Sequence, residues 1–442
     1  MHQSNVKNRT IFCRDNLQVL QGINSSSIDL IYLDPPFNKK KIFSAPIGSS
    51  AEGADFRDWF RKEDVKDEWI QEIKEDYDGL YKFLNNVKEL SSIVNTTRNK
   101  HYLYNYCYLC YMAIRLIEMR RILKDTGSIY LHCDNTMGHY LKILMDIIFG
   151  EKNFRNSIVW GYSHGGKGKR DFARKHDIIL RFVKSNQFFF NGNAVGFERQ
   201  TGKKSKGGRL GIDELGRPYQ DKIVKKTKKV YRYYLDEGKI PEDYWTDINS
   251  LQAGDKERTG YPTQKPLALL ERIIKASSHE EDIVLDAFCG CATTCIAAEK
   301  LKRQWIGIDV SVKAYELVKK RLKEEVANPN NLLQYNKEIV FSTDPPRRTD
   351  QNGDDALIKK YVYIISHPKY KGEYKVGIAS DIQARLTSYQ TSDPDRKYQI
   401  KYKKHTHLFR KIEKLIHEKY ENKHEWIKGN LQDIINDIEN YT

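Results

Sequence analysis

The sequence predicts an α/β fold with a mainly parallel sheet, interrupted by a basic insertion and followed by a small α+β unit. Apolar runs of strand length alternate with amphipathic runs of helix length on both sides of the insertion, which is typical of a parallel sheet. The insertion is rich in Lys and Gly and has little periodicity. A polar linker then precedes a second pattern of strands and helices, so we expect two domains.

The composition favours a nucleic-acid partner. The 442 residues include 75 Lys and Arg against 59 Asp and Glu, which gives a formal net charge of +16. An excess of this kind attracts polyanions, although a merely basic surface is the alternative. No apolar run reaches the roughly 18 residues of a membrane span, and the first residues lack the apolar core of a signal peptide. We therefore expect a cytoplasmic protein without a membrane partner.

The first informative strand is "SIDLIYL", which ends at the run "DPPFN". Two prolines and an asparagine stop the strand, so Asp34 lies at its C-terminal edge. Ligands bind at this edge in open α/β sheets. Residues 40–100 are expected to form helical insertions over that face. A long helix, a turn, a strand and a helix that ends at Gly150 follow.

The basic insertion covers residues 187–245. It is either a solvated loop region or, as we favour, a region that contacts DNA through lysines and tyrosines. We assign residues 1–340 to one domain that contains this insertion, 341–357 to a linker and 358–442 to a second domain. A second Asp-Pro-Pro triplet, which begins at Asp344, falls in the linker and is expected to be a rigid joint.

The run "VLDAFCGCATT" leads from a strand into a helix through small residues, so a ligand can approach the backbone closely. The first turn of the helix offers free N–H groups. At the end of the next strand, about twenty residues on, Asp309 can accept hydrogen bonds from both hydroxyls of a ribose. This combination predicts a nucleoside site in a Rossmann-like fold.

Asp286, Phe288 and Gly290 resemble the D-x-F-x-G signature of the S-adenosylmethionine-dependent DNA amino-methyltransferases of the β class. Ala292 stands where the usual run of that family, "DPFxGxGTT", has its second glycine. The resemblance implies that S-adenosyl-L-methionine is the cofactor.

The resemblance extends to the run "TQKP" just upstream. It implies that Thr263 and Lys265 lie against the methionine end of the cofactor, with Lys265 paired to the cofactor carboxylate. An ordinary turn before a helix is the alternative. Asp15 matches an acid that the family often places near the cofactor adenine.

Asp34, Pro35, Pro36 and Phe37 match the D-P-P-[YF] catalytic motif of the same family. The residue types suit the chemistry. The Asp34 carboxylate and the Pro35 carbonyl can accept hydrogen bonds from an amino group of a base, which localises the nitrogen lone pair for attack on a sulfonium methyl. Positioning then supplies most of the acceleration. Phe37 offers a ring on which a flipped base can stack.

The order of the motifs also resembles the β class: catalytic motif, basic region, cofactor motif. The resemblance covers about residues 8–345. It implies methylation of adenine N6 in double-stranded DNA, a role in a restriction–modification system and a homodimer. An Asp at the head of the catalytic motif favours adenine, and N4 of cytosine is the alternative target.

The C-terminal unit resembles the GIY-YIG nuclease domain over about residues 358–430. Tyr363 matches the first tripeptide of that family, Gly377 closes the second, and Arg385 matches an arginine on the following helix. Glu413 matches the glutamate that binds a divalent metal such as Mg²⁺.

One position of the second tripeptide departs from the family. Lys375 stands where the second tyrosine is usual, and Tyr374 lies one residue earlier, which places it on the other face of a strand. His417 follows the predicted metal ligand by one helical turn and could assist it. The domain is thus either an active nuclease or a module that binds DNA without cutting it.

Overall fold

The computed structural model describes residues 4–441 apart from residues 94–99, 164–169, 197–207, 237–238, 322–338 and 351–359 and single positions or pairs at 380–381, 392, 394, 407 and 424–425. Part of the expected linker and part of the basic insertion therefore lie outside the described residues.

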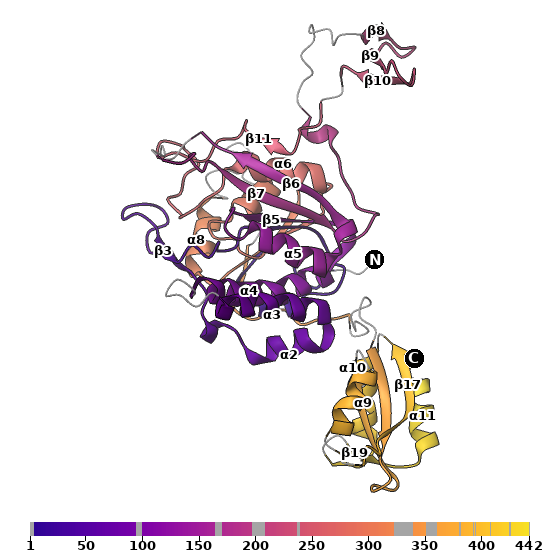
Figure 1. The fold of residues 1–442 in the computed structure, drawn as a ribbon. Coiled ribbons are helices and arrows are strands. Elements are labelled where there is room, and N and C mark those ends of the chain that lie inside the picture. Colours follow the sequence, from indigo (N-terminus) through magenta and orange to yellow (C-terminus); the bar gives the residue numbers. More distant parts are fainter. Residues whose placement is uncertain are drawn as a thin grey trace.

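A central sheet organises the larger unit (Figure 1). Its described strands run in the order β11 (Tyr244–Trp245), β6 (Phe154–Gly161), β7 (His176–Val183), β5 (Leu123–Cys133), β2 (Ile28–Leu33), β12 (Ile283–Asp286), β13 (Gln304–Asp309), β1 (Thr10–Cys13) and β14 (Val340–Ser342). Neighbouring strands are parallel throughout, except that β7 runs antiparallel to β5 and β6. The mainly parallel sheet predicted from the sequence is confirmed.

Helices cover both faces of this sheet. One face carries α1 (Asn16–Gly22), α2 (Asp67–Asp76), α3 (Asp78–Ile93), α4 (Lys100–Ile122) and α5 (Gly138–Phe149), and the other carries α6 (Leu267–Ser277), α7 (Thr293–Lys300) and α8 (Val312–Arg321). Alternate residues of β2 enter the two cores, so Ile31 packs on the first face and Leu30 on the second. This burial on both faces explains the nearly continuous apolar runs.

The segment that follows the first Asp-Pro-Pro is less helical than expected. It begins with a hairpin of β3 (Lys41–Ser44) and β4 (Asp55–Asp58), and the helical part starts at the short 3-10 turn of Lys62–Asp64. Among the described residues, no helix is long and apolar enough to cross a bilayer.

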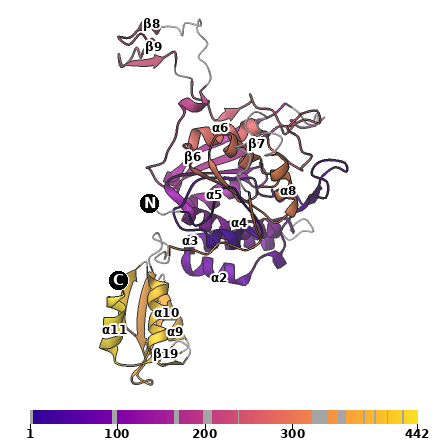
Figure 2. The same ribbon diagram turned by 180° about the vertical axis from the view of Figure 1, so that it is seen from behind.

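The basic insertion contains a small antiparallel sheet of β8 (Gly208–Ile212), β9 (Pro218–Ile223) and β10 (Val230–Tyr234). Both ribbon views draw it away from the central sheet (Figures 1 and 2). On one face, Arg232 lies over the Tyr219 ring and pairs with Asp221. The other face exposes Tyr231 and Tyr233.

The first residues of the expected linker pair with the central sheet of the larger unit. The last two residues of β14, Phe341 and Ser342, pair with Ile11 and Phe12 of β1 at the edge of the sheet. Beyond them, Asn24 accepts a hydrogen bond from the Thr349 amide at 2.8 Å, and Asp350 accepts one from the Ser25 amide at 2.7 Å. We call residues 343–350 the strap.

Gly22 makes room for the strap. A Cβ atom at this glycine would lie 1.9 Å from the Pro346 carbonyl oxygen. We expect Gly22→Ala to destabilise the larger unit by about 1–3 kcal/mol, because the strap has to move. Gly79→Ala is the matched control, since a Cβ at Gly79 meets no atom within 4 Å. Urea unfolding of both variants checks this, and equal midpoints would show that the strap is not held here.

The C-terminal unit is a second, smaller α+β arrangement. Its described strands run in the order β17 (Gln399–Thr406), β15 (Lys360–Ser366), β16 (Glu373–Ala379), β19 (Trp426–Lys428) and β18 (Asn422–Lys423). One face packs against α9 (Ile382–Thr391), and the other packs against α10 (Phe409–Lys419) and α11 (Leu431–Asn440). Residues of β15 and β16 alternate between the two cores.

Candidate active site

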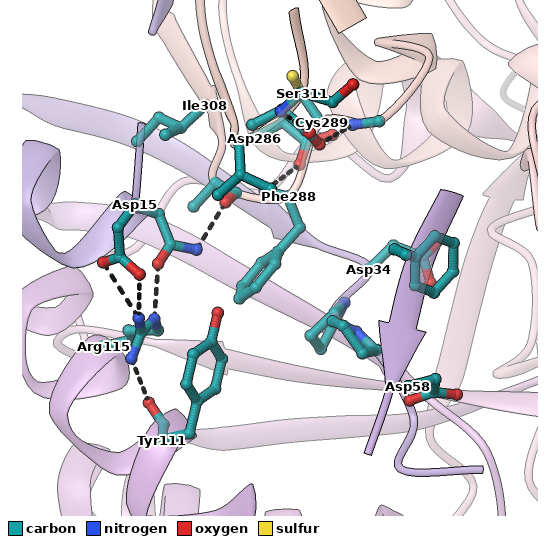
Figure 3. A pocket seen from close by; sticks show the side chains of 18 of the residues that line it. Asp15, Asp34, Asp58, Tyr111, Arg115, Asp286, Phe288, Cys289, Ile308 and Ser311 are labelled. Atoms are coloured by element: carbon teal, nitrogen blue, oxygen red, sulfur yellow. Dashed lines mark hydrogen bonds and ion pairs between the residues drawn. The ribbon is translucent and has the colours of Figure 1, made fainter. Parts of the chain in front are cut away.

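A cavity of about 910 Å³ lies at the C-terminal ends of β1, β2, β12 and β13. Parallel strands bring these ends to one edge, where polar residues that follow the strands meet. All the residues predicted for the methyltransferase site line this cavity: Asp15, Asp34, Pro35, Pro36, Phe37, Thr263, Lys265, Asp286, Phe288, Gly290 and Asp309. Figure 3 shows several of them from close by.

Asp309 is held by the backbone of the turn opposite it. Its carboxylate accepts hydrogen bonds from the amides of Gly290 and Ser311, each at 2.9 Å. Burial raises the pKa of the Asp309 carboxyl. Gly290 has a φ of +48°, and a Cβ there would lie 2.8 Å from the Tyr261 ring, so the turn needs glycine at this position. Ala292, at the unusual position, takes a left-handed φ of 58°.

Asp286 holds the same turn from inside the protein. It accepts hydrogen bonds from the Thr294 hydroxyl at 2.5 Å and from the Phe288 amide at 3.0 Å. Burial raises the pKa of the Asp286 carboxyl to about 7. Through these hydrogen bonds, the Asp286 side chain stabilises the turn between β12 and α7.

The raised pKa of Asp286 predicts a pH-dependent stability. Between about pH 4 and pH 7 the folded chain binds more protons at this position than the unfolded chain. Its contribution to the free energy of unfolding therefore falls as the pH rises through this window, by at most about 1.4 kcal/mol per pH unit. Urea unfolding of wild type and Asp286→Asn should differ less at pH 5 than at pH 8, where the wild type has lost this stability. A pH-independent difference would contradict the assignment.

Arg115 is a site residue that the sequence did not reveal. This fully buried side chain on α4 donates to both carboxylate oxygens of Asp15, at 2.8 and 3.1 Å. It also donates to Asn16, which in turn donates to the Ala287 carbonyl at 2.8 Å (Figure 3). Asp15 caps α1 through the Leu17 amide. An arginine inside the apolar run "YMAIRLIEM" was the available signal, because a buried charge needs a partner.

Lys265 lies beside Asp34 in the cavity. Its ammonium group donates to Asp34 Oδ2 at 2.5 Å and to the Thr263 carbonyl at 3.2 Å. The expectation from the sequence was a partner at the methionine end of a cofactor. In the structure, the carboxylate that Lys265 contacts belongs to the chain itself.

A buried histidine supports the aromatic residue of the catalytic motif. The rings of Phe37 and His132 stack with their centroids 5.9 Å apart. His132 hydrogen bonds to the Tyr32 hydroxyl through Nδ1 at 2.9 Å and to Asp177 through Nε2 at 3.1 Å. Burial lowers the pKa of His132, so the ring is neutral at pH 7. His132 and Asp177 lie in the runs "GSIYLHCD" and "HDIILRF", for which no role was predicted from the sequence.

In the C-terminal unit, the structure brings Tyr363 and Arg385 together. The Tyr363 hydroxyl lies 2.9 Å from the Tyr389 hydroxyl and 3.3 Å from Arg385 Nε, which donates to it. A Cβ at Gly377 would lie 2.7 Å from the Tyr363 hydroxyl, so glycine is needed opposite this tyrosine. Lys375 lies over the Tyr389 ring, 4.4 Å from its centroid. We call Tyr363, Lys375, Arg385 and Tyr389 the tyrosine–cation group.

Three other predicted residues are not part of this group. Tyr374 packs into the opposite core, because side chains alternate along β16. His417 hydrogen bonds to the Val376 carbonyl at 3.1 Å, and both His417 and Glu413 lie on α10, which covers that opposite face. Within the described residues, no three His, Cys, Asp or Glu side chains are grouped so that they could hold a metal ion.

The fold and the cavity together define an α/β enzyme with a nucleoside-type turn beside an Asp-Pro-Pro-Phe strand end. The family model described as DNA methylase matches residues 28–320. The chain therefore belongs to the DNA methylase family. A second model, described as the T5orf172 domain, matches residues 360–441.

The chain is similar to individual curated proteins and to a solved structure. The chain is 32% identical to the type II methyltransferase M.EcaI of Enterobacter cloacae, over 51% of this chain and 61% of that protein. It is 28% identical to the DNA adenine methyltransferase YhdJ of Escherichia coli, over 71% and 82%. Among solved structures, the cytosine-N4-specific PvuII DNA methyltransferase aligns with 12% identity and a TM-score of 0.44, over 79% of this chain and 98% of that one.

Proposed function

We propose that the chain transfers the methyl group of S-adenosyl-L-methionine to N6 of adenine in double-stranded DNA. The observation that carries the proposal is the position of Asp34. It directly follows β2 and lines the cavity that Asp309 and the turn at Gly290 also line. The proposed acceptor for an amino group and the proposed site for a nucleoside cofactor thus line one cavity.

The residues present fit the proposed cofactor. Asp309 lies where a carboxylate can accept from ribose hydroxyls, and the 910 Å³ cavity is large enough for a nucleoside with an amino-acid tail. Phe288 and Asp15 line the same cavity. When bound, the cofactor supplies an electrophilic sulfonium methyl group.

The chain's own residues would then orient the acceptor. The Asp34 carboxylate and the Pro35 carbonyl would accept the two N–H groups of the adenine amine, and Phe37 would stack on the flipped base. Because Phe37 rests on the neutral His132 ring, its orientation is fixed before the base arrives. Positioning is the main source of the proposed rate enhancement.

Adenine is preferred over cytosine because the catalytic motif begins with Asp. The relatives include an adenine methyltransferase, whereas a structural neighbour is specific for cytosine N4. The experiment that separates these targets is direct sequencing of plasmid DNA from cells that express the chain, with modified bases read during sequencing. Methyladenine at one short sequence supports the proposal, and methylcytosine at one short sequence overturns it.

We propose that residues 1–350 form the methyltransferase unit and that residues 187–245 recognise the target sequence. The described sheet of β8, β9 and β10 carries exposed tyrosines and lysines, which suit stacking and phosphate contacts. The resemblance to the β class also predicts a homodimer, which sedimentation would test.

A second candidate function concerns the C-terminal unit. In the tyrosine–cation group, two cationic side chains lie beside two tyrosine hydroxyls. Groups of this kind can donate hydrogen bonds to a DNA phosphate. We propose that this unit binds DNA and, in the nuclease alternative, cuts it. The described residues around the group do not fit a bound Mg²⁺, because Glu413 lies on the helix that covers the other face.

Plasmid incubated with Mg²⁺ separates the two alternatives for this unit. If the unit only binds DNA, neither wild type nor Arg385→Ala nicks the plasmid, and the variant binds DNA more weakly. If the unit is a nuclease, wild type nicks the plasmid, whereas Arg385→Ala and Glu413→Ala do not. Nicking by all three proteins would come from a contaminant.

A further inference from the structure

The contact between Lys265 and Asp34 joins two distant parts of the sequence inside the cavity. The Lys265 side chain is 8% exposed and the Asp34 side chain is 18% exposed. Their charged atoms lie 2.5 Å apart. An ion pair that is shielded from water in this way is screened less by salt than a surface pair, and loss of one partner leaves an unpaired buried charge.

The backbone fixes Lys265 in this position. Thr263 has a left-handed φ of 62°, and its carbonyl accepts a second hydrogen bond from the Lys265 ammonium group. Pro266, the next residue, is the N-cap of α6. The backbone of Lys265 therefore lies between a strained turn and the start of α6. Its ammonium group lies 5.5 Å from the Phe37 ring centroid.

The pair uses only one oxygen of the catalytic carboxylate. Lys265 donates to Asp34 Oδ2, and among the described residues Oδ1 has no hydrogen-bond donor. A carboxylate that is fixed through one oxygen cannot rotate freely about its terminal bond, so the other oxygen keeps a defined direction. The amino group of a target base needs one such oriented acceptor.

We propose that Lys265 is a positioning residue for Asp34: it holds Oδ2 so that Oδ1 is directed at the amino group of the target base. This inference rests on the proposed methyltransferase function. It differs from the expectation that Lys265 binds the cofactor carboxylate. The two roles predict opposite results, because a positioning residue acts on the rate of methyl transfer and a cofactor ligand acts on cofactor affinity.

The test compares Lys265→Met and Lys265→Arg with wild type and with Lys275→Met, a surface variant on α6. Equilibrium dialysis measures the Kd of S-adenosyl-L-methionine, and single-turnover assays at saturating cofactor measure methyl transfer to DNA. We expect Lys265→Met to transfer methyl groups about 100-fold more slowly, which is the size expected for a lost charged hydrogen bond. Its Kd should stay within about threefold of wild type. Lys265→Arg should recover part of the rate, and Lys275→Met should behave as wild type.

A double variant gives a second readout. In an Asp34→Ala background, Lys265→Met should slow the reaction no further, because the carboxylate that it positions is gone. A weaker Kd with an unchanged rate at saturating cofactor would overturn the proposal in favour of cofactor binding. Unchanged Kd and rate would also overturn it. Failure of the wild-type chain to methylate any DNA would instead refute the proposed function, so the two failures are distinguishable.

Discussion

An Asp34→Ala variant is expected to lose methyl transfer while it keeps its cofactor. The variant removes the only side-chain acceptor that the catalytic motif offers to the amino group of the base. Removing one oriented hydrogen-bonding group from a transition state costs about 10²–10³ in rate. Single-turnover methylation at saturating S-adenosyl-L-methionine measures this loss, and equilibrium dialysis shows that the Kd of the cofactor stays near the wild-type value.

This variant needs a control for stability, because Asp34 is the ionic partner of the buried Lys265. Loss of the carboxylate leaves Lys265 without its ionic partner in the cavity, which destabilises the fold. Asp34→Asn keeps the size of the side chain and one acceptor oxygen, so it should retain more stability than Asp34→Ala and still be slow. Equal losses of methylation and of cofactor binding in both variants would contradict the role assigned to Asp34.

An Asp309→Ala variant is expected to lose the cofactor. Its carboxylate is proposed to accept two ribose hydroxyls, and hydrogen bonds to a charged group contribute about 1.5–3 kcal/mol each. The Kd of S-adenosyl-L-methionine should therefore rise by about 100-fold or more. The amides of Gly290 and Ser311 also lose their acceptor, so the turn that approaches the cofactor loosens.

Titration calorimetry with S-adenosyl-L-methionine measures this affinity. Asp247→Ala is the control, because Asp247 pairs with Arg272 away from the cavity-lining residues. It should bind the cofactor as wild type does. An Asp309→Ala variant with unchanged Kd would show that the ribose is held elsewhere.

The sequence predicts the main parts of the candidate site because strand ends determine where they lie. Asp34 directly follows β2, and Asp286 and Asp309 are the last residues of β12 and β13, so the sheet brings them together without any knowledge of side-chain contacts. The cofactor turn and the catalytic strand end were predictable for this reason.

The contacts between distant segments were not predictable in the same way. Lys265 and Asp34 are 231 positions apart, and each belongs to a motif with its own expected role. Arg115 lies in an apolar helix, where only tertiary packing reveals that Asp15 is its partner. His132 supports Phe37 from the neighbouring strand, a relation that depends on sheet order.

The face of β16 and the short strand β14 could not be predicted from the sequence pattern. Tyr374 and Lys375 are adjacent, and only the register of β16 decides which one faces Tyr363. Lys375 is on that face. The strand β14 has three residues within a polar stretch, so its sequence has too little periodicity to distinguish it from a linker.

The identity of the methylated nucleoside tests the central claim most directly. Unmethylated duplex DNA is incubated with the chain and with S-adenosyl-L-methionine that carries a deuterated methyl group, then digested and analysed by mass spectrometry. We predict labelled N6-methyl-2′-deoxyadenosine with wild type and, over the same short incubation, about 10²–10³-fold less with Asp34→Ala. Labelled N4-methyl-2′-deoxycytidine, or no labelled nucleoside from a chain that binds the cofactor and DNA, would contradict the proposed function.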